Sequence, residues 1–117
     1  MKSIFTNHKD FGGQFIKEFE SSLKTSNNIT IASGYVGTTT IEDLETRFVS
    51  TAKKGSCRIL VGMVYHGGVT AKQLKALSSL DNKLRAVSSD NGVYITRQQY
   101  HGKIYEFEAN EDIKLYL

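Results

Sequence analysis

The stretch that decides the fold is Gln99-Tyr100-His101-Gly102-Lys103-Ile104-Tyr105-Glu106-Phe107, close to the carboxyl end of the 117-residue chain. The stretch is typical of a β-strand. Side chains in a strand alternate between its two faces, so we expect His101 and Lys103 on the same side with the small Gly102 between them. An imidazole beside an ammonium suits a phosphodiester, because the ring nitrogen can attack phosphorus or donate a proton while the ammonium holds the phosphate oxygens.

The residues before this stretch alternate between helix and strand patterns. Helices are predicted over 10–25, 39–54 and 70–80, and strands over 29–33, 58–63, 84–88 and 92–97. Asp10 is a candidate cap for the first helix, and the pairs Thr39 with Glu42 and Thr70 with Gln73 resemble capping boxes that open the other two. The alternation predicts one α/β domain over residues 1–117, with a mixed, largely parallel sheet flanked by helices.

Composition limits the class of protein and its compartment. The chain has 39% hydrophobic and 23% charged residues, which fits a soluble globular domain. It shows no apolar run long enough for a transmembrane helix and no signal-peptide pattern, so we predict a cytoplasmic protein without a membrane partner. The single cysteine, Cys57, and three scattered histidines make no zinc site. The net charge of +3 is compatible with a polyanionic partner such as DNA.

The His101-Gly102-Lys103 motif and its place in this α/β order resemble the phospholipase D superfamily. Members of that superfamily cut phosphodiester bonds through a phosphohistidine and need no metal or other cofactor. Within it, the segments 31–36, 59–63 and 100–105 are most similar to the branch of NgoFVII-type restriction endonucleases, which pair an amino-terminal nuclease domain with a carboxyl-terminal DNA-recognition domain. The resemblance therefore implies a DNA endonuclease of restriction type.

The resemblance also implies roles for individual residues. His101 would be the nucleophile or its partner acid, and Lys103 the cation that binds the phosphate. The family carries an acid five positions after the lysine, where this chain has Glu108 in place of Asp. Glu108 is seven residues from His101, an odd number, so a regular strand places it on the opposite face. We therefore expect Glu108 to be a structural hydrogen-bond partner rather than the general base.

The family's phosphate site needs more than this sequence contains. A Gly-Ser-x-Asn segment follows the next strand in the family, whereas here residues 112–117 are expected to be the start of that strand. We therefore expect this stretch of chain to be inactive alone, with the Ser, the Asn and the acid that orients His101 supplied beyond Leu117. The chemistry needs two histidines and the chain has one such motif, so the resemblance implies a symmetric homodimer that joins two copies of His101.

Two strand ends could touch the substrate. His66 lies in a His-Gly-Gly segment between a strand and a helix, where α/β proteins gather ligands; a flexible connection with an exposed histidine is the interpretation we favour. Ser33 and Tyr35 lie at the end of another strand, and Tyr35 could stack on a base. Ordinary turn chemistry explains these two residues equally well. Two other functions stay open: a non-catalytic module of a helicase or other DNA-processing protein, and a phospholipid-headgroup phosphodiesterase.

Overall fold

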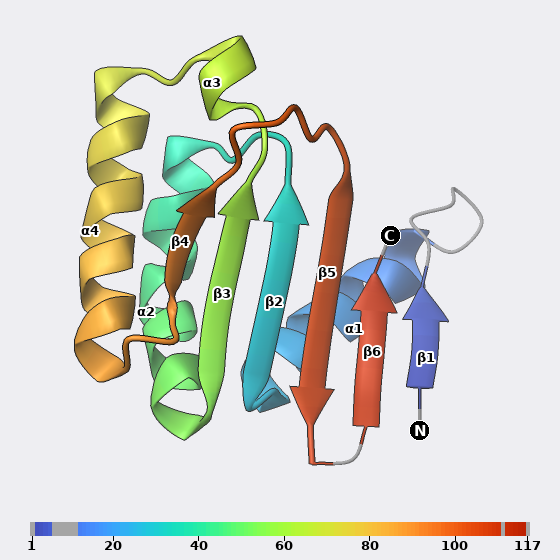
Figure 1. Cartoon of the computed structure of the whole chain (residues 1–117). Coiled ribbons are helices and arrows are strands. Elements are labelled where there is room, and N and C mark those ends of the chain that lie inside the picture. The colour runs from blue at the N-terminus through green and yellow to red at the C-terminus, as the bar shows by residue number, and fades with distance from the viewer. Residues whose placement is uncertain (1, 6–11, 111, 117) are drawn as a thin grey trace.

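The computed structural model describes residues 2–5, 12–110 and 112–116, which form one sheet and a layer of helices (Figure 1). Asp10, predicted as a helix cap, lies outside these residues. The elements in chain order are β1 (Lys2–Phe5), α1 (Gly12–Thr25), β2 (Asn28–Ser33), α2 (Thr38–Lys54), β3 (Ser56–Val61), α3 (Val64–Gly67), α4 (Ala71–Val87), β4 (Gly92–Ile95), β5 (Lys103–Ala109) and β6 (Asp112–Tyr116).

The sheet has six strands in the order β1-β6-β5-β2-β3-β4. Pairs β1–β6, β2–β3 and β3–β4 are parallel, whereas β5 runs antiparallel to both of its neighbours, β2 and β6. The predicted fold class, a mixed and largely parallel sheet in an α/β domain, is confirmed. The carboxyl ends of β2 and β3 therefore share one edge of the sheet with the amino end of β5, which we call the β2–β3–β5 edge (Figure 1).

The core lies between the sheet and the helices α1, α2 and α4. In Figure 1, α1 and α2 lie behind the sheet and α4 stands beside β4 at the left. Burial alternates along β2 and β3, as expected when one face of a strand is covered. On α1, the ring of Phe19 packs edge-on against Tyr105, Phe107 and Tyr116, with ring centroids 5.1–5.4 Å apart. No helix among the described residues is long and apolar enough to cross a membrane.

The strand predicted over residues 84–88 is wrong. Residues 84–87 are the last turn of α4, because Leu84 continues the buried stripe that Leu77 and Leu80 begin on one side of that helix. The strand predicted over 92–97 exists as the shorter β4. Two elements, β1 and the short α3, were not predicted. A four-residue element offers too few positions for its periodicity to be recognised.

One of the two predicted capping boxes is confirmed. The Thr70 hydroxyl accepts a hydrogen bond from the Gln73 backbone N–H at 3.1 Å, and the Gln73 side-chain oxygen accepts one from the Thr70 N–H at 2.9 Å. The box predicted at Thr39 is wrong. Helix α2 already begins at Thr38 after Gly37, a cap residue with no side chain, so Thr39 falls inside the first turn.

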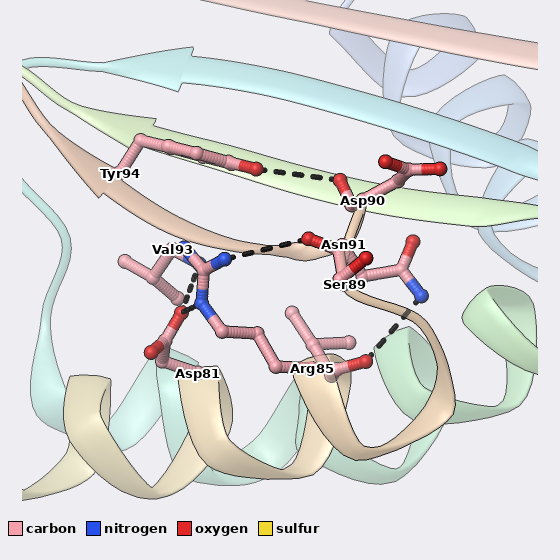
Figure 2. A network of polar contacts seen from close by, with 8 residues as sticks. Asp81, Arg85, Ser89, Asp90, Asn91, Val93 and Tyr94 are labelled. Carbon is pink, nitrogen blue, oxygen red and sulfur yellow. Dashed lines mark hydrogen bonds and ion pairs between the residues drawn. The ribbon is translucent and has the colours of Figure 1, made fainter.

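A polar network holds β4 against α4 (Figure 2). Asp81 on α4 accepts hydrogen bonds from Arg85 Nε and from the Val93 backbone N–H, both at 2.8 Å. The Arg85 guanidinium also lies 5.1 Å from the centre of the Tyr94 ring. Gly92 fits this site because its φ of 145° disfavours other residues and an added Cβ would meet the Arg85 guanidinium. The network fixes the outer strand of the sheet.

Candidate phosphodiester site

His101 lies in the connection before β5, not within the strand as the sequence predicted. The pairing of β5 with β2 ends at Lys103 opposite Ser33, followed by one more hydrogen bond from the Gly34 N–H to the Gly102 carbonyl at 2.9 Å. The exposed His101 packs over Gly34, where an added Cβ would lie 3.0 Å from His101 Cδ2 and 3.1 Å from its Cα. Because Gly34 has no Cβ, His101 can pack at this position of the β2–β3–β5 edge.

Tyr35 contacts His101 directly. The two rings meet edge to face, with centroids 5.5 Å apart and planes at 89°. The hydroxyl end of Tyr35 reaches α3, since a Cβ on Gly67 would lie 2.6 Å from that oxygen. Tyr35 therefore spans from the histidine to the turn after β3, although half of its surface remains exposed.

Lys103 is the first residue of β5 and is exposed. It shares a face of the sheet with its partner Ser33 and with Tyr105, the face that the helices cover. Lys103, Ser33 and Tyr35 all line one cavity beneath this edge. The Ser33 hydroxyl donates a hydrogen bond to the Tyr35 carbonyl at 2.7 Å, which holds the chain in its turn away from β2.

His66 lies on α3 at the same edge of the sheet and is exposed. Its Nε2 is 3.2 Å from the Arg97 carbonyl, a hydrogen bond if the ring carries its proton there. This contact joins α3 to the connection between β4 and β5, which leads to His101. The structure thus brings His66, Tyr35, Ser33, His101 and Lys103 to one edge.

Glu108 lies far from these residues. It is near the other end of β5, where it pairs with Asn28 and Ile113. It lies five positions after Lys103, which corresponds to about 17 Å along a strand. Its backbone carbonyl accepts a hydrogen bond from the Asn27 N–H at 2.8 Å. The Glu108 carboxylate therefore cannot reach His101 of the same chain.

Two glycines that build the site were not recognised as site residues from the sequence. Gly34 accommodates His101, and Gly62 accommodates Tyr100, whose backbone and ring would both meet a Cβ at position 62. Each glycine directly follows a buried strand, β2 or β3, and this shared position was the available signal. Within the described part of the chain, no three His, Cys, Asp or Glu side chains form a group that could hold a metal ion.

The chain matches a known protein family over nearly its whole length. The family model is that of the NgoFVII restriction endonuclease N-terminal PLD domain, and it matches residues 14–116. The match includes every residue brought to the β2–β3–β5 edge. None of the curated proteins matches the chain. The similarity first indicated by the His-Gly-Lys motif is thus confirmed.

Proposed function

The chain belongs to the family of the NgoFVII restriction endonuclease N-terminal PLD domain, and from this premise we propose that it is a nuclease domain that cuts DNA through a covalent intermediate on His101. The observation that carries the proposal is the placement of His101 and Lys103 together at the β2–β3–β5 edge. His101 is exposed and packs on Gly34 and Tyr35, so its ring is both accessible and held in place.

The proposed reaction has two steps. In the first, a ring nitrogen of His101 attacks phosphorus, the bond to the leaving oxygen breaks, and a second imidazolium gives that oxygen a proton. In the second, water attacks the phosphohistidine, the phosphorus–nitrogen bond breaks, and the second imidazole takes the proton of the water. Lys103 stabilises the negative charge that the phosphoryl oxygens gain in both transition states. These steps use no metal ion.

The second imidazole is proposed to come from another copy of the chain. The other described histidine, His66, lies on α3, where its Nε2 contacts the Arg97 carbonyl. A twofold axis beside the β2–β3–β5 edge would bring His101 and Lys103 of two copies to one phosphate. The same arrangement would double the number of cations at the phosphate. DNA is the proposed substrate, and a cytoplasmic homodimer the proposed form.

The first test is plasmid cleavage in excess EDTA by the protein, beside its His101→Ala variant. We expect discrete fragments from the wild type and none from the variant. Because His101 is exposed, the variant should keep the melting temperature of the wild type, and this control separates chemistry from folding. Cleavage only after Mg²⁺ is added, or equal cleavage by the variant, would contradict the mechanism.

A second measurement addresses the intermediate. Radiolabelled DNA mixed with the wild type and quenched in denaturant should leave label attached to the protein. A phosphorus–nitrogen bond is hydrolysed by acid and survives alkali, unlike the ester that a serine would form. Label that is stable in acid, or that persists in His101→Ala, would assign the nucleophile to another residue.

A further inference from the structure

The β2–β3–β5 edge opens into a cavity of about 300 Å³ between the sheet and the helices α1, α2 and α4. This volume is at the lower end of the range for small-molecule sites in proteins. Close packing would have filled such a space, because an unfilled cavity loses the contacts of its lining. The cavity therefore requires an explanation that the proposed chemistry at His101 does not supply.

The cavity has an apolar interior and a polar mouth. Its deep wall consists of core residues such as Ile59 and Leu80, which are almost completely buried. Phe19 and Tyr105 contribute two aromatic rings, which meet edge to face with centroids 5.1 Å apart. Thr40 and Lys103, two exposed residues with polar side chains, also line the cavity and mark its mouth. An uncharged, flat group attached to an anion matches this distribution.

The mouth lies beside the proposed phosphate position. Lys103, the proposed phosphate-binding residue, lines the cavity, and so does Tyr35, whose other contact is the ring of His101. A phosphate between His101 and Lys103 would therefore carry one of its two substituents past Tyr35 toward the cavity. The phosphate fixes the entry point, and the aromatic and apolar walls select what enters.

We propose that this cavity receives a nucleobase next to the phosphate that is cut, so that the enzyme takes one base out of the stack before cleavage. The proposal rests on the proposed function, because it needs a phosphate at Lys103. Unstacking a base costs free energy, which contact with aromatic side chains offsets. Thr40, with a hydroxyl that can accept or donate a hydrogen bond, meets the polar edge of the base.

The test compares three ligands that share a phosphate, namely thymidine 5′-monophosphate, methyl phosphate and hexyl phosphate. Their dissociation constants for the protein are measured by calorimetry. We expect the nucleotide to bind roughly tenfold more tightly than methyl phosphate, the size of effect that stacking of one base gives. Equal affinities for these two would overturn the proposal. Hexyl phosphate binding as tightly as the nucleotide would also overturn it, by assigning the cavity to a hydrocarbon chain.

A matched pair of variants locates the effect. Thr40→Phe places a ring in the mouth of the cavity, whereas Thr39→Phe makes the same change one residue earlier in α2, at an exposed position that does not line the cavity. We expect Thr40→Phe to remove the advantage of the nucleotide and Thr39→Phe to keep it. Methyl phosphate should bind alike to both variants, as a control for folding.

The ligands also separate this proposal from the one on which it rests. Failure of every phosphate to bind would remove the phosphate site at Lys103 and, with it, both proposals. Binding of methyl phosphate without any preference for the nucleotide would leave the nuclease proposal intact and overturn only the base cavity. A nucleotide preference that survives Thr40→Phe would show that the base binds elsewhere, which also overturns the cavity.

Discussion

At the scale of single residues, the geometry of the candidate site depends on Gly34 having no side chain. Gly34 has an ordinary backbone conformation, and its requirement is steric, because His101 Cδ2, His101 Cα and the Tyr100 carbonyl would all lie 3.0–3.2 Å from a Cβ there. Contacts that short are tighter than normal packing, so the loop that carries His101 must move when position 34 is enlarged. The position of His101, the proposed nucleophile, thus depends on a glycine at position 34.

We predict that Gly34→Ala impairs catalysis more than folding. The displaced His101 should lower kcat about tenfold to a hundredfold, as small displacements of reacting groups do. The overlap should cost about 1–3 kcal/mol of stability. DNA cleavage rates and urea denaturation check the two effects, with Gly34→Ser expected to lose more than Gly34→Ala. Full activity in both variants would show that the position of His101 is not critical.

A second residue-scale prediction concerns Cys57, the buried thiol in β3. Burial raises the pKa of this thiol from its ordinary 9.0 to about 12. Between these two values the unfolded state loses the proton while the folded state keeps it, so stability falls as pH rises from about 9 to 12, by up to roughly 1.4 kcal/mol per pH unit. Below pH 9 the contribution of this group is constant.

Comparison with Cys57→Ala isolates this effect, because the pKa values of Tyr105 and Tyr116 are raised by burial as well. The wild type should lose more stability than the variant between pH 9 and 11 in urea titrations. In the folded protein at pH 8, a thiol reagent should not label Cys57. Rapid labelling under these conditions would show that the thiol is accessible.

At the scale of elements, the start of α4 differs from the start of α2. The Thr70 hydroxyl and the Gln73 side chain satisfy two backbone N–H groups at the first turn of α4, whereas Gly37 offers α2 no side-chain cap. We predict that Thr70→Ala costs about 1 kcal/mol of unfolding free energy. Thr39→Ala is the control and should change stability by a few tenths of a kcal/mol at most, since alanine suits a helix interior. Equal losses would contradict the assigned caps.

The helices α1, α2 and α4 and the strands β2 and β3 could be predicted from the sequence because each carries its own periodicity. The errors have physical causes. The sequence predicts a strand at Leu84 and its neighbours because a short apolar run fits either structure. In the fold, Leu84 continues the buried stripe of α4. The sequence predicts a strand at His101 because the residues after Lys103 continue the strand pattern, whereas the end of β2 at Ser33 ends the pairing.

At the scale of the whole molecule, the topology depends on contacts that no local pattern encodes. β5 lies between β2 and β6, and β1 pairs with β6 at the opposite end of the chain (Figure 1). This arrangement places the motif at the carboxyl ends of β2 and β3, so residues of the candidate site from positions 33 to 103 meet at one edge. The sequence indicated the motif and the other candidate residues, whereas only the fold shows that these residues lie together at one edge.

The final prediction follows from the single His-Gly-Lys motif in the chain. If each site takes His101 from two copies, a dimer of one wild-type and one His101→Ala subunit is inactive. When wild-type protein is refolded with an equal amount of the variant, about half of the wild-type subunits should enter such mixed dimers, and activity should fall to about half. Refolding with an unrelated protein at the same concentration controls for losses.

The dependence of activity on the ratio of variant to wild-type subunits makes this measurement decisive. With a rising excess of His101→Ala, activity at a constant amount of wild type should fall toward zero, because few wild-type subunits then pair with one another. A site contained within one subunit predicts no change at any ratio, since the variant would be a bystander. Size measurements on the two proteins alone would not make this distinction, because a dimer can form without sharing its sites. Loss of activity in proportion to mixed pairing would therefore assign both histidines to one shared site.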